Sequence, residues 1–368
     1  MRNFRFAIVS DLHIAIPQTI WDNPSRFHLV EISIPVLETI FDRLRSADLD
    51  FLLIPGDLTQ HGEPENHRWL AKRLAQLPYP VFVVPGNHDV PVAVADDRSI
   101  GIGDFTRYYA QFGYDDLDRL YYTHELLPGL HLIGLNSNLF DASGTQFGVL
   151  DDEQFQWLEA VLEKRRDEVV LVMIHHNVIE HLPGQSRNKL GQRYMLDNAP
   201  VLRKLLRSNN VQLIFTGHLH IQDVAFDRGL YDITTGSTVT YPHPYRILEY
   251  YTDLHGHSWL QIESGRVEAV EGWHNLPRIS RTWMGDRSRP FMLRLLTDEP
   301  LNLSEEEAEP LVPSLRYFWA TIANGDAQFE FANFPPKPRR FFESFSATLE
   351  NGSLALIDNH VALKLGCW

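Results

Sequence analysis

Short runs of apolar, often β-branched residues recur along the first 240 or so positions, and amphipathic stretches separate them. Six of these runs have the length and the Val and Ile content of buried strands: Phe6–Val9, Phe51–Ile54, Val81–Val84, Leu130–Leu135, Val169–Ile174 and Val211–Phe215. Three stretches between them follow the 3.6-residue period of an amphipathic helix: Ile34–Leu44, Phe155–Leu162 and Val201–Leu206. Alternating strand and helix signals predict an α/β domain with a largely parallel sheet.

Two regions depart from this alternation. Residues 90–125 carry several aspartates and tyrosines and are expected to be an inserted, cap-like segment. The stretch Trp259–Val270 is expected to form a hairpin around Glu263-Ser264-Gly265. We therefore expect a catalytic domain over residues 1–275 and a small C-terminal accessory region over 276–368, of β character and open role.

Composition narrows the class of protein. The 368 residues include 33 Lys and Arg against 48 Asp and Glu, a net charge of −15, with 17 histidines and one cysteine, Cys367. One cysteine excludes a disulfide framework and a cysteine-rich zinc module. The acidic balance argues against binding to a nucleic acid polymer, because phosphate backbones bind basic faces. The absence of a signal-peptide core or a long apolar span predicts a cytoplasmic protein without a membrane span.

Polar residues with metal-ligating chemistry follow five of the predicted strands. The segments after the strands are Asp11-Leu12-His13, Gly56-Asp57, Gly86-Asn87-His88-Asp89, His175-His176-Asn177 and Gly217-His218-Leu219-His220. In open α/β sheets, ligands bind outside the carboxyl ends of the strands. Each motif alone has an ordinary explanation as a turn or a core histidine, but five of them at successive strand ends do not.

This ligand set predicts a metal centre with two ions. Carboxylate, amide and imidazole ligands without thiolate suit Mn, Fe, Co, Ni or Zn. Seven ligands exceed the needs of one ion, and two ions about 3.5–4 Å apart would use them by sharing a carboxylate. The glycines before Asp57, Asn87 and His218 are expected to let the backbone turn tightly.

The five motifs together resemble the calcineurin-like metallophosphoesterase superfamily over residues 4–240. Gly56-Asp57-Leu58-Thr59 looks most like the class III cyclic nucleotide phosphodiesterase and glycerophosphodiesterase group. The resemblance implies a four-layer α/β/β/α sandwich. It also implies that one metal binds Asp11, His13 and His220, that a second binds Asn87, His175 and His218, and that Asp57 bridges them.

The sequence departs from the family pattern at two places. The fourth motif usually reads His-x-Pro, and here His175-His176-Asn177 lacks the proline, so His176 stays a rival ligand to His175. Gln60 stands where an acid often partners the motif histidine, which leaves the charge on His88 open. We expect His88 to be catalytic and Asn87, His88, His176 and His243 to contact substrate. Trp21, Asp22, Arg26 and His28 lie in a loop near the expected cleft mouth.

The predicted function is hydrolysis of a small phosphodiester, of the cyclic nucleotide or glycerophosphodiester type, by metal-bound hydroxide. Two divalent ions less two carboxylates leave the cleft at about +2, which attracts a small anionic phosphoester. The alternatives are a phosphomonoesterase, a nucleotide or lipid-linked pyrophosphatase, and a catalytically idle scaffold. A homo-oligomer is compatible with the sequence.

Overall fold

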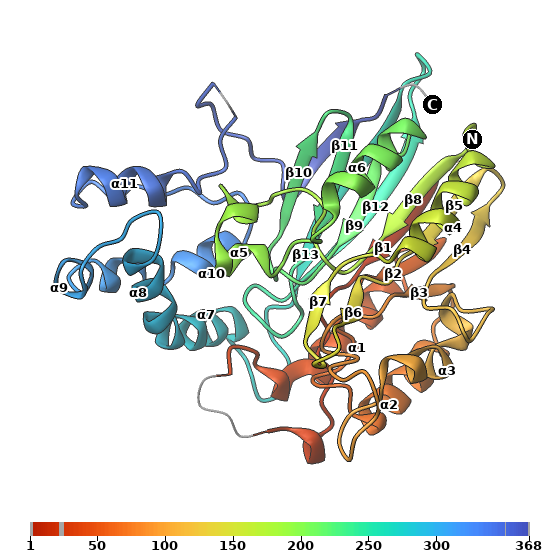
Figure 1. The fold of residues 1–368 in the computed structure, drawn as a ribbon, viewed down its shortest axis with the longest axis horizontal. Coiled ribbons are helices and arrows are strands. Elements are labelled where there is room, and N and C mark those ends of the chain that lie inside the picture. Colours follow the sequence, from red (N-terminus) through yellow and green to blue (C-terminus); the bar gives the residue numbers. More distant parts are fainter. Residues whose placement is uncertain (1–2, 22–25, 350, 367–368) are drawn as a thin grey trace.

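Two large sheets lie at the centre of the fold, and the first is a mixed sheet of six strands (Figure 1). In the computed structural model, which describes residues 3–21, 26–349 and 351–366, its order is β14-β13-β12-β1-β2-β3. β1, β2 and β3 run parallel, and the other three strands extend the sheet in antiparallel fashion. The bounds are β1 Phe4–Ile8, β2 Phe51–Ile54, β3 Val81–Val83, β12 Pro244–Thr252, β13 Ser258–Arg266 and β14 His360–Lys364.

A second six-stranded sheet has the order β10-β11-β9-β8-β5-β4. Its four central strands are parallel, and β4 and β10 form antiparallel edges. The bounds are β4 Tyr122–Leu127, β5 Leu130–Gly134, β8 Val169–Met173, β9 Leu213–Thr216, β10 Asp223–Asp227 and β11 Leu230–Thr234. The short strands β6 (Asn138–Phe140) and β7 (Gln146–Gly148) form a separate hairpin. All six strands expected from the sequence are present.

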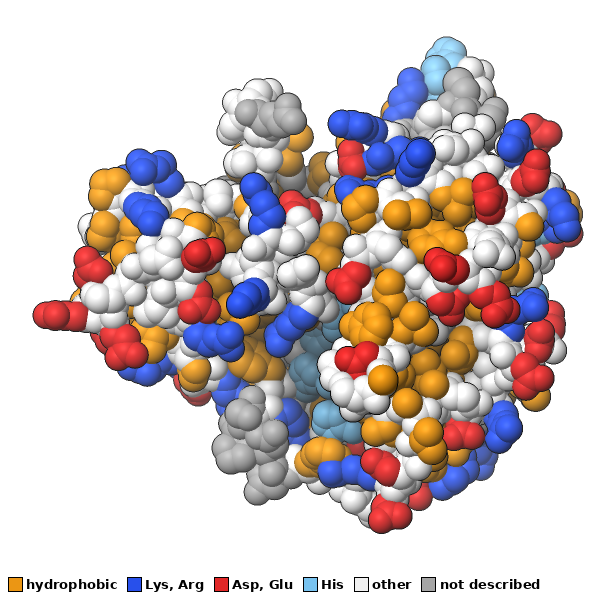
Figure 2. Space-filling model, viewed as in Figure 1, with side chains coloured by type: hydrophobic (Ala, Val, Ile, Leu, Met, Phe, Trp, Pro, Cys, Tyr) orange, Lys and Arg blue, Asp and Glu red, His pale blue; other side chains and the backbone are white. Residues whose placement is uncertain are grey.

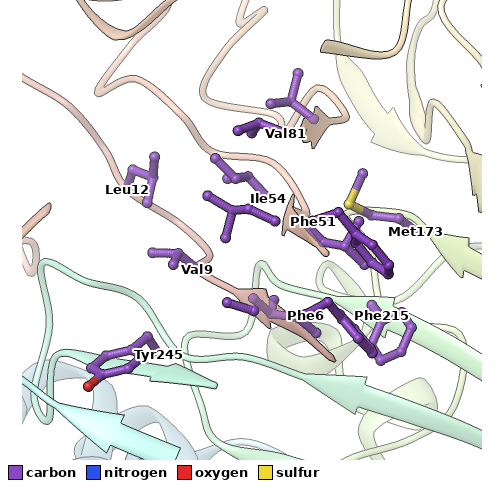
Figure 3. Close-up of a cluster of buried hydrophobic side chains, with 14 of the residues drawn as sticks. Phe6, Val9, Leu12, Phe51, Ile54, Val81, Met173, Phe215 and Tyr245 are labelled. Carbon is purple, nitrogen blue, oxygen red and sulfur yellow. The ribbon is translucent and has the colours of Figure 1, made fainter. Parts of the chain in front are cut away.

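The two sheets face each other across an apolar layer. Figure 3 shows Phe6 and Phe51 of the first sheet pointing toward Phe215 and Met173 of the second. The rings of Phe6 and Phe51 stack at 4.9 Å, and Phe215 meets Phe6 edge-on at 5.5 Å. Successive side chains of a strand point to opposite faces, so the alternate residues of the second sheet face away from this layer.

Helices cover the outer faces of both sheets. α4 (Asp152–Glu163) and α6 (Ala199–Ser208) pack on the outward residues of the second sheet, such as Val172 and Ile214. α1 (Ser33–Leu44) and α2 (Pro64–Leu74) pack with the first sheet. The Asp151 side chain caps α4 by accepting the Gln154 N–H at 2.7 Å. The expected four-layer α/β/β/α fold is confirmed.

Residues 90–125 extend the main core. The segment contains the short helix α3 (Phe105–Tyr108) and the first part of β4. Phe105, Tyr109 and Tyr114 are buried in the same cluster as the first sheet. The hydroxyls of Tyr114 and Tyr122 both donate to the carbonyl oxygen of Val83 at the end of β3. The segment therefore supports the end of β3.

The hairpin expected around Glu263-Ser264-Gly265 is wrong. β12 and β13 do form a hairpin, but its turn lies at residues 253–257, and Gly265 lies inside β13 opposite Tyr245. A Cβ on Gly265 would lie 2.2 Å from the Tyr245 ring. Gly265 therefore makes room for a neighbouring aromatic ring and does not form a turn.

The expected β character of the C-terminal region is wrong over residues 276–345, which we call the helical unit. Its helices are α7 Leu276–Arg287, α8 Arg289–Thr297, α9 Glu305–Ala308, α10 Phe318–Ala323 and α11 Pro336–Glu343. The acidic run after Ser304 is a capping box, in which Ser304 and Glu307 each accept the other's backbone N–H. The Pro-rich stretch begins α11, where Pro336 is the first residue.

The helical unit has its own apolar cluster but remains joined to the sheets. Leu219 and Ile221, which follow β9, are buried in that cluster beside Phe318 and Phe342. The chain then returns through β14, which pairs with β13. Asp358 links the two regions, since its carboxylate accepts the backbone N–H groups of Val224 and Asp326. None of the helices in the described ranges has the length and apolar character needed to cross a bilayer.

Candidate active site

The loops after β1, β2, β3, β8 and β9 converge at one edge of the two sheets. Five of the seven expected ligands in them have positive φ values: Asp11 51°, His13 43°, Asp57 50°, His218 67° and His220 58°. Non-glycine residues reach this left-handed region at a cost of about 1–3 kcal/mol each, and such strain gathers at functional sites. The surrounding backbone enforces it; the N–H of His13, for example, donates to the carbonyl oxygen of Asp57 at 2.9 Å.

A first cluster contains Asp11, His13, Asp57 and His220, whose ligand atoms all lie within 4.8 Å of one another. The Nε2 atoms of His13 and His220 are 3.2 Å apart, and Nε2 of His220 is 3.2 Å from Oδ1 of Asp11. Burial and the neighbouring His28 hold the pKa of His13 well below its usual value. His13 is therefore neutral, the form in which imidazole binds a metal.

A second cluster contains Asp57, His175 and His218, again within 4.8 Å. Nε2 of His175 lies 3.4 Å from Oδ1 of Asp57 and 3.1 Å from Oδ1 of Asn87. The amide of Asn87 thus joins the cluster. Because Oδ2 of Asp57 lies 3.6 Å from Nε2 of His13, the two oxygens of this carboxylate face one cluster each. Asp57 therefore lies between the two clusters.

Asp57 and His175 stabilise each other's charged form. Burial opposes ionisation of Asp57, but His175, and then His88 and His13, outweigh it and hold the pKa of Asp57 well below its usual range. Burial likewise opposes a charged His175, but Asp57 raises the pKa of His175 to about 9. A cation at this position would replace the proton of His175.

Backbone carbonyl groups set the tautomers of the histidines. Nδ1–H of His175 donates to the carbonyl oxygen of Pro55 at 2.8 Å, so Nε2 is the nitrogen that faces Asp57 and would bind a cation in place of its proton. Nε2–H of His218 donates to the carbonyl oxygen of Arg193 at 3.2 Å, which leaves Nδ1 free. In each case a lone pair is directed by a hydrogen bond on the other ring nitrogen, as metal-ligating histidines require.

His88 lies beside Asp57. Its backbone N–H donates to Oδ1 of Asp57 at 2.9 Å, and its Nδ1–H donates to the carbonyl oxygen of Gln60 at 2.7 Å. Gln60 thus orients His88 through its backbone. The Gln60 Oε1 atom is buried without a hydrogen-bond partner in the described part of the chain.

The three motif glycines are needed for close packing more than for turning. Gly56 alone of them has a positive φ, 94°. A Cβ on Gly86 would lie 2.2 Å from Oδ1 of Asp57, and a Cβ on Gly217 would lie 2.5 Å from Oδ2 of Asp11. Any side chain at these two positions would displace a carboxylate of the site.

The remaining expected site residues lie in different places. His176 belongs to neither of the two clusters among the described residues; it shares a 2.7 Å hydrogen bond with Ser137 and lines the cleft described below. His243 is fully buried, its Nδ1–H donates to the carbonyl oxygen of Thr238, and it does not line the cleft. Trp21 and Arg26 line a smaller neighbouring cavity, and Asp22 lies outside the described residues.

His28 is placed more centrally than its sequence position suggests. Its ring centroid lies 4.1 Å from that of His13 and 4.8 Å from that of His220. Its ligand atom groups with those of the same two histidines. Nothing in the spacing of the motifs marks this residue, since it lies in an irregular loop far from any strand end.

Members of both clusters, Asp57, His218 and His220, line one cleft of about 650 Å³. Figure 2 shows histidine side chains in the hollow between the helical unit and the two-sheet body. The floor includes Asp57, Asn87 and His88, and a basic wall carries Lys189 and Arg193 around the short helix α5 (Lys189–Gln192). Asp197 lines the same cleft, so the site combines metal-ligating groups with two cationic side chains and a further carboxylate.

Residues 4–222 match the model of a known family, the calcineurin-like phosphoesterases. The chain belongs to this family. The matched range contains all seven expected ligands and His88 and ends before the helical unit. The helical unit lies outside the matched range.

Several named proteins resemble this phosphoesterase. A glycerophosphodiester phosphodiesterase of Enterobacter lignolyticus is 26% identical over 239 residues, which cover 64% of this chain and 80% of that protein. A 3',5'-cyclic-nucleotide phosphodiesterase of Nostoc sp. is 29% identical over 176 residues, 47% of this chain and 56% of that one. A probable glycerophosphodiester phosphodiesterase of Arcobacter nitrofigilis is 27% identical, over 46% of this chain and 56% of its own. The chain thus spans little more than half the length of the last two relatives.

A solved structure supports the fold assignment. The dimetal phosphatase of Danio rerio superposes with a TM-score of 0.51 at 19% identity, covering 72% of this chain and 96% of that one. At this identity the likeness concerns the fold of the phosphoesterase core alone.

Proposed function

We propose that this chain is a phosphodiesterase that uses two metal ions to hydrolyse small phosphodiesters. The observation that carries the proposal is the position of Asp57, which faces two ligand clusters at the floor of one cleft. The names of the relatives, which act on cyclic nucleotides or glycerophosphodiesters, support a diester substrate. The complete ligand set argues against an idle scaffold.

The donors fit two borderline-hard divalent ions. Asp11, His13 and His220 would hold one ion, Asn87, His175 and His218 the other, with Asp57 between them. Imidazole and oxygen ligands without thiolate suit Mn, Fe, Zn or Co. When bound, such ions supply Lewis acidity to the phosphoryl oxygens and lower the pKa of a water toward neutrality.

The chain's own residues would bind the ester and handle the proton. Lys189 and Arg193 line the cleft together with Asp57 and Asp197, so the two cations balance these two carboxylates. With the metal ions bound, the cleft would be positive and would attract an anion. We expect Asn87 and His176, which line the cleft, to contact the phosphoryl group. Nε2 of His88 is the atom left to give a proton to the leaving alkoxide, because its Nδ1–H is held by Gln60.

The test compares two chromogenic esters with the same leaving group. Protein reconstituted with Mn, Fe, Zn or Co should hydrolyse bis(p-nitrophenyl) phosphate at least about tenfold better than p-nitrophenyl phosphate, judged by kcat/KM. Asp57→Ala and Asn87→Ala should reduce turnover to background, and metal analysis should give about two ions per wild-type chain.

The matched control is Asp167→Ala, which removes an exposed carboxylate in the turn after α4. This variant should keep both its metal and its activity. A tenfold preference for the monoester would replace the proposal by a phosphomonoesterase. Purified protein that takes up no metal and hydrolyses neither ester would show a scaffold.

We further propose a cytoplasmic location. A chain with a single cysteine cannot form an internal disulfide, which is the bond that an oxidising compartment favours. Cell fractionation tests it. A homo-oligomer is compatible with the proposal, and light scattering of the purified protein measures it.

A further inference from the structure

The cleft has a wall that the metal chemistry does not use. Four residues from the helical unit line it, all beyond the family match at residues 4–222: Met284, Ser288, Phe291 and Trp319. Phe27, from the loop that carries His28, lines the same cleft. Three of these five residues are aromatic and one is methionine, so the wall is apolar.

Two of the aromatic rings form a preformed pair. Phe291 of α8 and Trp319 of α10 meet edge to face, with centroids 5.6 Å apart and planes at 73°. Both side chains are half-buried, with the apolar cluster of the helical unit packed behind them. Rings held in this way bind a planar ligand at a small cost in conformational entropy.

The wall is joined directly to the metal-ligating floor. Nε1–H of Trp283 in α7 donates to the carbonyl oxygen of Phe27 at 3.1 Å, and the next residue is His28, whose ligand atom groups with those of His13 and His220 in the first cluster. Leu219, between His218 and His220, is buried in the cluster of the helical unit. A phosphoester held at the floor would therefore have its ester group within reach of the wall.

We propose that the helical unit is a specificity device, in which Phe291 and Trp319 select phosphodiesters that carry a planar aromatic group. This inference rests on the proposed function. An aryl group or nucleobase would stack on the ring pair, and an alkyl chain would gain burial but no stacking. A small polar ester such as a glycerol ester would leave the apolar wall without a partner.

The experiment uses esters that share the p-nitrophenolate leaving group and differ in the group retained. The metal-loaded full chain should hydrolyse phenyl p-nitrophenyl phosphate about 10-fold better than methyl p-nitrophenyl phosphate, judged by kcat/KM. Trp319→Ala should remove this preference, mainly through KM for the phenyl ester, and should change the methyl ester less than about twofold. Trp319→Phe should restore part of the preference.

The matched control is Phe341→Ala, which removes an aromatic ring of the helical unit that does not line the cleft. It should keep the phenyl preference. A similar loss in Phe341→Ala, or an equal loss for both esters in Trp319→Ala, would overturn the proposal. So would a hexyl ester that is hydrolysed as well as the phenyl ester, which would indicate a pocket for alkyl chains.

A binding measurement separates this inference from the proposed function. Calorimetry with the metal-loaded protein should give about 10-fold tighter binding of phenyl phosphate than of methyl phosphate, and Trp319→Ala should abolish the difference. This result needs no turnover. Hydrolysis of both diesters at equal rates would refute the aromatic wall alone. A protein that hydrolyses neither diester but retains the binding preference would refute the phosphodiesterase and leave the wall supported.

Discussion

The two-sheet body and the helical unit form opposite sides of one cleft, but they contribute different chemistry. The body supplies the seven expected ligands from loops at its strand ends, and five of the seven have positive φ values. The helical unit supplies aromatic and apolar side chains from a separate cluster, and none of its residues belongs to the metal-ligating groups of the described chain. Under the two proposals above, the body would act on the phosphoester and the helical unit would select it.

The largest effect is expected from His88 in the body. His88→Ala should lower kcat by about 10²–10⁴-fold on a diester with an alkyl leaving group, because the alkoxide then leaves without a proton. The loss should be much smaller with p-nitrophenolate, which needs no protonation. Steady-state kinetics on the two esters gives the ratio.

The control for that prediction is His255→Ala, at an exposed position in the turn between β12 and β13. It should leave both esters unaffected. An equal loss on both esters in His88→Ala would mean that His88 acts on the phosphoryl charge and not on the leaving group.

A buried phenylalanine in each region tests whether the two fold as one. Phe215 packs between the sheets and Phe342 packs edge-on against Phe318 at 5.1 Å. Both are fully buried, so each change to Ala should lower the free energy of unfolding by about 3–5 kcal/mol. Denaturant unfolding followed by circular dichroism and tryptophan fluorescence measures both.

Because β14 and Asp358 join the regions, both variants should shift a single cooperative transition. Phe342→Ala should also weaken the preference for phenyl esters, while Phe215→Ala should not. A separate early transition in Phe342→Ala would show that the helical unit unfolds independently of the sheets.

The smallest effect is expected from the helix caps, one in each region. Asp151 caps α4 and Ser304 caps α9, each accepting a backbone N–H of the first turn. Replacement of either by Ala should cost about 1 kcal/mol of stability. Thermal unfolding measures the shift, and the exposed variant Asp167→Ala is the baseline. A loss near zero for Ser304→Ala would show that α9 contributes little to the helical unit.

The fold of the body could be predicted because its signals are local. The strands Phe51–Ile54 and Val169–Met173 were expected from apolar runs of strand length, and α4 from its acidic N-terminus. The helical unit was mispredicted because its apolar residues are spread over short helices. Its local signals, the capping box at Ser304 and the proline at the start of α11, were present.

The site residues that directly follow strands could be predicted from the sequence. The positions of His28 and His243, which lie in irregular loops, could not. The spacing of Asp11, His13 and Asp57 relative to their strands was enough to bring them to one edge of the sheet. His28 reaches the same place because Trp283 and the backbone of Val239 hold its loop. Neither contact can be predicted from the spacing of residues along the sequence. The burial of His243 could not be predicted either, because a histidine after a strand can point into the core or into the cleft.

The ligand chemistry and the layered core follow from local properties of the chain, namely the period of a strand and the residue at its end. What the ligands face depends on long-range packing. Apolar side chains between residues 284 and 319 form a wall of the cleft because α7, α8 and α10 bury their other faces against Leu219 and Ile221. That contact joins segments that lie more than sixty residues apart in the sequence. No local sequence pattern predicts which distant segment a helix will pack against.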